Sequence, residues 1–394
     1  MRLFNLDLRL APALAARLGQ PLHAGLTVGQ LEIDLAAALP AGAVEQRAGG
    51  CVTPNWGDPH NDVALIAVSQ IQQVARGNGV VAISPSAVLK NVGVTDVPWR
   101  GKFSPPGPPY DNDQHPYLVW NMYRVANGAL EQLGASGLKH AFLTLNTNCG
   151  CPSGNILWVN CEDTYGVGTN DSSGNVGPRK EISAFTGIWN RCGSIFDTNC
   201  DGLPNSAPPF SGPDDRRRLG VMETDLQTPG AQYYFESWYV VRDDTNIFNT
   251  MGYRQVSPAF SGTAWTFGLL TALIPGPVID AWVNPANPGP LADSQRVVTE
   301  AGQLTLAVRA TDLGGGRWRY NYALMNHDYD RKVRSFAIPL PEGAVVTNTG
   351  FHDGDRNANT DWTATVNPGV EIVWQGPTTV AGRLGALLDW GMLN

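Results

Sequence analysis

Short apolar stretches, separated by Gly, Pro, Asn and Ser, follow one another along most of the chain. Stretches of this length between turn residues are typical of β-strands. Those before residue 272 are Val63 to Val68, Val80 to Ile83, Val88 to Val94, Tyr117 to Val125, His140 to Leu145 and Phe235 to Val241. The pattern predicts a mainly β protein with many loops.

The C-terminal part has the most regular alternation. Apolar residues alternate with polar or small ones around Leu306 and again around Tyr320, and TDLGGG at 311–316 joins the two runs. A two-residue period interrupted by a glycine turn predicts a β-hairpin. Further strands are expected at Val333 to Ile338, Val345 to Phe351, Trp362 to Val366 and Val370 to Trp374. Their spacing predicts a β-sandwich of the immunoglobulin or fibronectin kind.

Changes in composition and in the pattern of apolar residues divide the chain into four parts. They are an atypical Ala/Leu-rich extension (1–50), a cysteine-containing, loop-rich β domain (51–272), a Pro-rich connection (273–293) and the β-sandwich (294–394). The segment LLDWGMLN near the end has the pattern of an entering strand. We therefore expect the sandwich to lack its last strand.

Composition and charge exclude several classes of protein. The chain has 12 Trp, 44 Gly without a three-residue period, and no apolar run long enough to span a membrane. This excludes a disordered, a collagenous and an integral membrane protein. The net charge is −8 and no long basic tract is present, so we expect no nucleic acid partner. No phosphate-binding glycine motif occurs, so we expect no nucleotide cofactor.

Six cysteines lie in the first 200 residues: Cys51, Cys149, Cys151, Cys161, Cys192 and Cys200. An even number in a Lys-poor, Trp-rich chain favours disulfides and an oxidising compartment, which means the periplasm, the cell surface or the extracellular space. The alternative is a metal site, but the spacing matches no standard zinc motif. Fifteen pairings remain open. Asp7, Arg9 and Arg17 interrupt the apolar run that an export signal needs, so we expect an altered N-terminus.

Several segments of the chain are distinctive: HPYLVWNMYR (115–124), GLKHAF (137–142), the cysteine cluster, TDLGGGRWRYNYAL (311–324) and GFHD (350–353). In these motifs the chain resembles a group of uncharacterised exported bacterial proteins of planctomycetes and proteobacteria. The resemblance covers about residues 51–390. It implies export and a β-rich fold, and it brings no established activity. Residues 1–50 depart from it, where a leader would be expected.

Three histidines near the cysteine-rich loops are candidate metal ligands: His60, His115 and His140. Converging imidazoles bind copper or zinc, and Asp58, Asp62 or Asp113 could add a ligand. The spacing is too long for a local motif, so the site depends on the fold. The alternative is that His115 and His140 are buried at strand ends and satisfied by hydrogen bonds.

Two acidic loops are candidate calcium sites. The first alternates oxygen ligands at Asp197, Asn199 and Asp201, followed by Gly202, although Pro208 stands where a calcium loop has its bidentate Glu. The second alternates Asp353, Asp355, Asn357, Asn359 and Asp361. The alternative is an ordinary turn, since Asp, Asn and Gly are the residues that turns prefer.

Other chemistry has less support in the sequence. No Ser nucleophile motif is present. Glu162 and Glu236 are a distant candidate carboxylate pair for glycoside hydrolysis. Four tryptophans near Gly/Pro loops could form a platform for a sugar or polymer: Trp56, Trp99, Trp158 and Trp189. The default interpretation is that they belong to the core.

Two classes of function remain. The first is an exported extracellular or surface protein of binding or structural type, with an extracellular polymer, a carbohydrate or a cell-surface molecule as partner. The second is an extracellular copper or zinc enzyme that uses His60, His115 and His140. We favour the non-enzyme, because no segment carries a recognisable catalytic arrangement.

Overall fold

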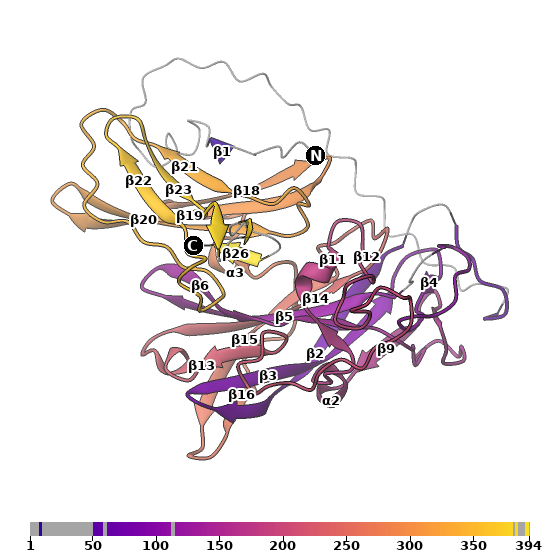
Figure 1. The fold of residues 1–394 in the computed structure, drawn as a ribbon. Helices are drawn as coiled ribbons and strands as arrows, with labels where there is room; N and C mark the ends of the chain where they lie inside the picture. The colour runs from indigo at the N-terminus through magenta and orange to yellow at the C-terminus, as the bar shows by residue number, and fades with distance from the viewer. Residues whose placement is uncertain are drawn as a thin grey trace.

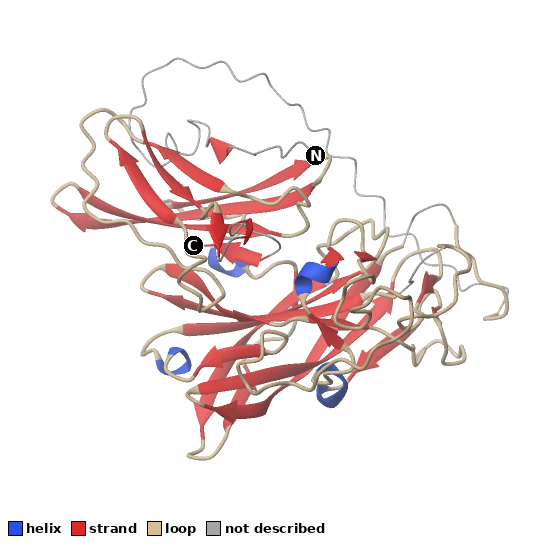
Figure 2. Cartoon of the chain, in the orientation of Figure 1, coloured by secondary structure: helices blue, strands red, loops and turns tan. Residues whose placement is uncertain are grey.

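The computed structural model describes residues 8–9, 50–57, 61–111, 115–380, 383–384 and 391–393. Strands dominate this part of the chain, and its helices are single turns (Figure 2). The predicted mainly β class is confirmed. The predicted elements around Leu26 to Leu35 lie outside the described residues.

The larger part of the molecule is a 12-stranded sheet (Figure 1). Its main path runs β10 (Val176–Gly177), β7 (Leu138–His140), β5 (Tyr117–Ala126), β14 (Gln232–Val240), β15 (Met251–Phe260), β16 (Trp265–Leu269), β2 (Val63–Gly77), β3 (Val80–Asn91) and β13 (Leu219–Met222). Off this path, β6 (Ala129–Ala135) pairs with β5, β9 (Glu162–Tyr165) with β3, and β17 (Ile274–Pro275) with β15. Side chains from its strands and the adjoining loops form the largest core cluster.

The strand boundaries differ from the predicted ones in three places. The first of the two apolar runs between residues 80 and 94 and most of the second form one strand, β3, which ends at Asn91. Pro85 lies inside it, between two register shifts of β2, where a residue without an N–H donor is tolerated. The run after His140 is mostly loop, since β7 ends at His140. The strand β6 was not predicted.

The C-terminal strands, drawn in orange and yellow in Figure 1, belong to two four-stranded sheets, one of which also includes the N-terminal strand Leu8–Arg9, drawn in indigo. One contains β18 (Ala292–Thr299), β19 (Gly302–Gly314), β20 (Arg317–Asn326) and β26 (Gly391–Leu393). The other contains β1 (Leu8–Arg9), β21 (Ser335–Pro339), β23 (Glu371–Gln375) and β22 (Thr363–Asn367). Leu306 and Leu324 from the first sheet share a core cluster with Phe336 from the second.

The predicted hairpin around TDLGGG is confirmed, because β19 and β20 pair on either side of it. The strand expected at 345–351 is wrong. Val345 is 85% exposed and residues 344–351 form no strand, although Phe351 at the end of the segment packs against the core of the two sheets. The strand entry expected near the C-terminus is present as β26, which pairs with β20.

Short elements fill the loops of the larger part and the end of the chain. They are β4 (Val97–Pro98), β8 (Ile156–Leu157), β11 (Ile182–Ser183), β12 (Ile188–Trp189), α2 (Val167–Asn170), α3 (Ile279–Trp282), β24 (Thr379–Val380), β25 (Arg383–Leu384) and the 3-10 turns Arg179–Glu181 and Asp225–Gln227. Most lie between residues 146 and 293.

The Pro-rich connection is part of the core. Ile279 and Trp282 are buried between Tyr123 of the large sheet and Ala307 of β19. The Glu236 carboxylate fixes the segment by accepting the backbone N–H of Val278 at 2.9 Å. The two parts of the molecule therefore meet through apolar packing as well as through the chain itself.

Candidate functional site

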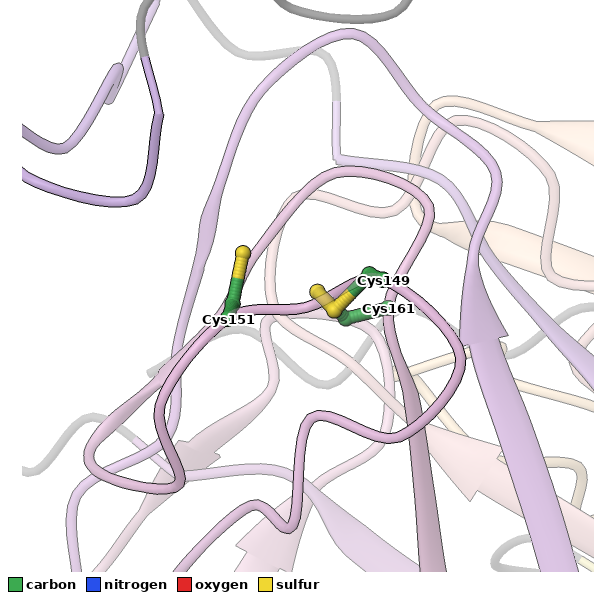
Figure 3. A group of neighbouring side chains, drawn as sticks. All are labelled: Cys149, Cys151 and Cys161. Atoms are coloured by element: carbon green, nitrogen blue, oxygen red, sulfur yellow. A yellow bond between two sulfur atoms is a disulfide. The ribbon is translucent and has the colours of Figure 1, made fainter.

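All six cysteines form disulfides, as expected: Cys51–Cys151, Cys149–Cys161 and Cys192–Cys200. Figure 3 shows Cys149, Cys151 and Cys161 next to one another, with their sulfur atoms within 4.8 Å. This is the only group of three metal-ligand side chains brought together among the described residues. Metals bind thiolates, so the group could hold an ion only after reduction of its two disulfides.

The fold brings His115 and His140 together. His140 is the last residue of β7 and pairs across the sheet with Tyr117, while His115 lies two residues before Tyr117 at the entry to β5. His115 Nε2 and His140 Nδ1 are 2.8 Å apart, which is a hydrogen-bond distance. Both side chains are buried, with exposed fractions of 4% and 0%.

Aromatic side chains enclose this histidine pair. The ring of Trp189 lies 4.8 Å from that of His140, and the rings of Phe196 and Tyr117 lie 5.1 Å and 5.3 Å from it. Burial lowers the pKa of His115 to about 3 and that of His140 well below its usual value. The nearby ammonium groups of Lys102 and Lys139 lower both pKa values further. Both imidazoles are therefore neutral at pH 7.

A neutral imidazole has one donor and one acceptor nitrogen. The contact between the two rings uses one nitrogen of each, and His115 Nδ1 and His140 Nε2 are left buried without a hydrogen-bond partner. Gly177 lies beside the second of these atoms, and a Cβ there would lie 3.3 Å from both His140 Nε2 and Glu181 Oε2. Burial raises the pKa of the Glu181 carboxyl.

Two of the three predicted histidine ligands, His115 and His140, lie together. Two nitrogens that bind one tetrahedral zinc ion at about 2.0 Å are about 3.3 Å apart, so the 2.8 Å contact is that of a hydrogen bond between the rings. His60, Asp58 and Asp113 lie outside the described residues. Asp62 accepts the Asn249 amide at 2.6 Å. Asn61, which directly follows His60, lines a small pocket together with His115. Metal binding by the three histidines stays a prediction.

Hydrogen bonds between its own residues stabilise the first candidate calcium loop. The Asp197 carboxylate accepts the Gly202 N–H at 3.2 Å, and Asp201 accepts the Asn199 amide and the Leu203 N–H, each at 2.8 Å. The disulfide Cys192–Cys200 closes the same loop. The oxygens that would bind calcium are therefore engaged by donors of the loop.

The second candidate calcium loop is a series of turns stabilised by side chains. Asp353, Asp355 and Asn357 each accept the backbone N–H two residues further on, at 3.0, 2.5 and 3.3 Å. Such turns are common without an ion. Burial raises the pKa of Asp353 to about 6, with smaller contributions from Asp355 and Asp361. Calcium binding at either loop stays a prediction.

Two other expectations are wrong because the residues on which they depend are buried. Trp99, Trp158 and Trp189 are buried, with exposed fractions of 0%, 6% and 6%, so they cannot form an exposed platform. Glu236 is also buried and accepts hydrogen bonds from the Asn121 amide, the Tyr123 hydroxyl and the Val278 N–H. These three hydrogen bonds anchor the carboxylate in the core.

Sequence reasoning missed two lysines near the histidine pair. Lys139 precedes His140 and points to the opposite face of β7, where its Nζ lies 2.6 Å from the centroid of the Tyr165 ring. Lys102 lies at a cleft beside Phe196. The scarcity of lysine, at five in 394 residues, was the only sequence signal that could have drawn attention to them.

Comparison of the chain with protein-family models, with curated proteins and with solved structures finds no match. None of the helices in the described residues is long and apolar enough to cross a membrane. The fold and the cysteine pairing define a disulfide-bonded, mainly β protein with a buried histidine pair.

Proposed function

We propose that this chain is an exported bacterial protein of binding or structural type, stabilised by its disulfides. The observation that carries the proposal is the pairing of all six cysteines. Disulfides form and persist in the periplasm and outside the cell and are rare in the cytosol. The resemblance to exported planctomycete and proteobacterial proteins supports the same location.

The burial of the histidine pair favours binding or structure over catalysis. A catalytic site must admit its substrate, whereas His140 is 0% exposed and aromatic rings surround it. The partner would be an extracellular polymer, a carbohydrate or a cell-surface molecule.

The test compares protein made in an oxidising compartment with protein made in a reducing cytosol. We expect the first to yield the three pairings above by non-reducing peptide mapping, and to lose stability on treatment with dithiothreitol. An unchanged melting temperature after full reduction, together with free thiols in protein recovered from the producing cell, would count against export and disulfide stabilisation.

The His115–His140 contact favours a second candidate, an extracellular copper or zinc enzyme acting on a polymer or a small oxidisable molecule. His60 would supply the third ligand, and the ion would polarise or activate a bound water or substrate. Elemental analysis of the purified protein tests this candidate, with His140→Ala as the ligand variant and His352→Ala as the matched control. One copper or zinc per chain, lost only in His140→Ala, supports it. Metal-free protein that stays metal-free after incubation with either ion rules it out.

A further inference from the structure

A cleft of about 380 Å³ opens beside the histidine pair. Its apolar walls come from segments far apart in the chain: Phe103, Phe142, Phe196, Pro204 and Ala207. Phe196 separates the cleft from the histidine pair, since its ring also packs 5.1 Å from that of His140. Small-molecule sites typically combine such apolar walls with a few directed polar groups.

The directed polar group here is the amine of Lys102. Its Nζ donates to the carbonyl oxygen of Gly174 at 3.1 Å and to Asn175 Oδ1 at 3.3 Å, and it lies 4.5 Å from the centroid of the Phe196 ring. Both acceptors are neutral. Gly174 and Phe196 also line the cleft, so the amine lies at its wall.

Burial weakens the ammonium form of this amine, so that a larger share of it is uncharged near neutral pH than for an exposed lysine. Burial lowers the pKa of Lys102 from 10.5 to about 8. Positive charges on Lys139 and Arg191 oppose the ammonium form. The two oxygen acceptors, the Phe196 ring and the carboxylates of Asp197 and Glu181 favour it. Burial outweighs these contacts and sets the direction of the pKa shift. A desolvated amine of this kind is a nucleophile toward carbonyl carbon.

We propose that the cleft binds a small aldehyde or ketone with an apolar body and that Lys102 forms an imine with it. The amine lone pair attacks the carbonyl carbon, and the carbinolamine formed then loses water. The carbonyl oxygen leaves with two hydrogens from the amine, and a C=N bond replaces the C=O bond. No oxidant, reductant or metal takes part. The proposal goes beyond the proposed function and requires neither export nor a metal ion.

The experiment uses the full, disulfide-intact chain with benzaldehyde as the probe and cyanoborohydride to trap the imine. The other four lysines serve as internal controls: Lys90, Lys139, Lys180 and Lys332. We expect peptide mapping to place the first benzyl group on Lys102, at a rate about tenfold above that of the exposed Lys180 at pH 7.5. The rate at Lys102 should rise with pH to a midpoint near 8.

Three variants distinguish the contribution of the cleft to the reaction from that of the amine. Lys102→Arg keeps the positive charge and should remove the fast reaction. Asn175→Asp places a carboxylate against Nζ, which favours the ammonium form and should slow the reaction at pH 7.5. Ser206→Trp fills the cleft from an exposed lining position and should block benzaldehyde while leaving Lys102 in place.

Two results would overturn the proposal. One is trapping at Lys102 no faster than at Lys180, or unaffected by Ser206→Trp. The other is protection of the cleft by benzoate together with no trapping of benzaldehyde, which would make it an anion site. If Lys102→Arg fails to fold, the Asn175→Asp and Ser206→Trp variants still decide the question.

Discussion

His115 Nε2 and His140 Nδ1 lie 2.8 Å apart in the core, although 25 residues separate them in the chain. The contact depends on the pairing of β5 with β7, which places His140 opposite Tyr117 and therefore next to the residue that leads into β5. Burial keeps both rings neutral. Folding therefore transfers two titratable imidazoles from water into a core in which they do not bind a proton.

This transfer predicts a dependence of stability on pH. Both histidines have a pKa in the folded protein below the value of 6.5 for an exposed ring. Below pH 6.5 the unfolded chain therefore binds protons that the folded chain does not, and stability falls as the pH falls. His140→Asn keeps a polar atom near the Nδ1 position but does not titrate. As the pH falls from 6 to 4, the free energy of unfolding of His140→Asn minus that of wild type should increase by about 1.4 kcal/mol per pH unit.

Urea unfolding of both proteins at several pH values checks this prediction. Carboxyl groups whose pKa is raised, such as Asp163 and Asp244, are present in both proteins, so the difference isolates His140. Parallel stability curves would show that His140 is protonated in the folded state, and would contradict the prediction.

Local patterns were enough to predict the mainly β class and the hairpin of β19 and β20. The hairpin depends only on alternation and a glycine turn, both of which are visible in one short segment. The contact of His115 with His140 depends on which strands pair and in which register, and neither is encoded locally. The same holds for Lys102, whose cleft walls come from residues 101 to 207.

The structure also shows what one local pattern could not reveal. The connection at 273–293 has the prolines of a loop, yet Ile279 and Trp282 pack between the two parts of the molecule. Proline content indicates where regular strands end. It does not indicate whether the apolar residues between the prolines are buried in a core.

The disulfides should differ in their contribution to stability. Cys51–Cys151 links residues 100 positions apart, whereas Cys149–Cys161 and Cys192–Cys200 span 12 and 8. In the loop-entropy account, removal of the longest loop costs about 4–5 kcal/mol and that of the shorter ones about 2.5–3 kcal/mol each. Double Cys→Ala variants, one per disulfide, measured by urea unfolding, should rank in this order. An equal loss in all three would show that native contacts, rather than loop length, set the effect.

Glu236 should stabilise the junction of the two parts as an acceptor only. Its carboxylate accepts the Asn121 amide at 2.8 Å, the Tyr123 hydroxyl at 2.9 Å and the Val278 N–H at 2.9 Å. Glu236→Gln would turn one acceptor into an NH₂ group that faces a donor. We expect a loss of about 1–3 kcal/mol and faster proteolysis within 273–293. Glu131→Gln, on the partly buried strand β6, is the control for proteolysis. Unchanged cleavage in Glu236→Gln would mean that packing of Trp282 alone holds the connection.

Gly137 should resist substitution because of space rather than backbone conformation. A Cβ at this position would come closest to the Gly177 carbonyl oxygen and would lie 2.9 Å from Arg217 Cα and 3.0 Å from the Arg217 carbonyl oxygen, all of them backbone atoms that cannot rotate away. Gly137→Ala should therefore cost about 1–3 kcal/mol. Gly166→Ala is the matched control, since a Cβ at Gly166 meets no atom within 4 Å. Equal melting temperatures for the two variants would indicate that the chain near Arg217 moves to make room.

The buried amine of Lys139 should lower the free energy of unfolding at neutral pH. Its Nζ is buried against the rings of Tyr165 and Phe142 without a hydrogen-bond partner, and burial lowers its pKa well below 10.5. Asp163, the carboxyl group that favours its charged form, is itself buried and has its pKa raised to about 6. Replacing a buried charge by an apolar side chain of similar volume is often stabilising. We expect Lys139→Met to raise the free energy of unfolding by about 1–3 kcal/mol at pH 7.

The sign of the pH dependence distinguishes this explanation from a simple gain in packing. Between the lowered pKa of Lys139 and 10.5, the unfolded chain binds a proton that the folded chain does not. Wild-type stability therefore rises with pH across this window, and the advantage of Lys139→Met should shrink as the pH approaches 10. Urea unfolding at pH 7 and pH 9.5 measures it, with Lys180→Met as the exposed control. A pH-independent gain would assign the effect to packing, and a loss of stability would show that the aromatic rings hold Lys139 as a favourable cation.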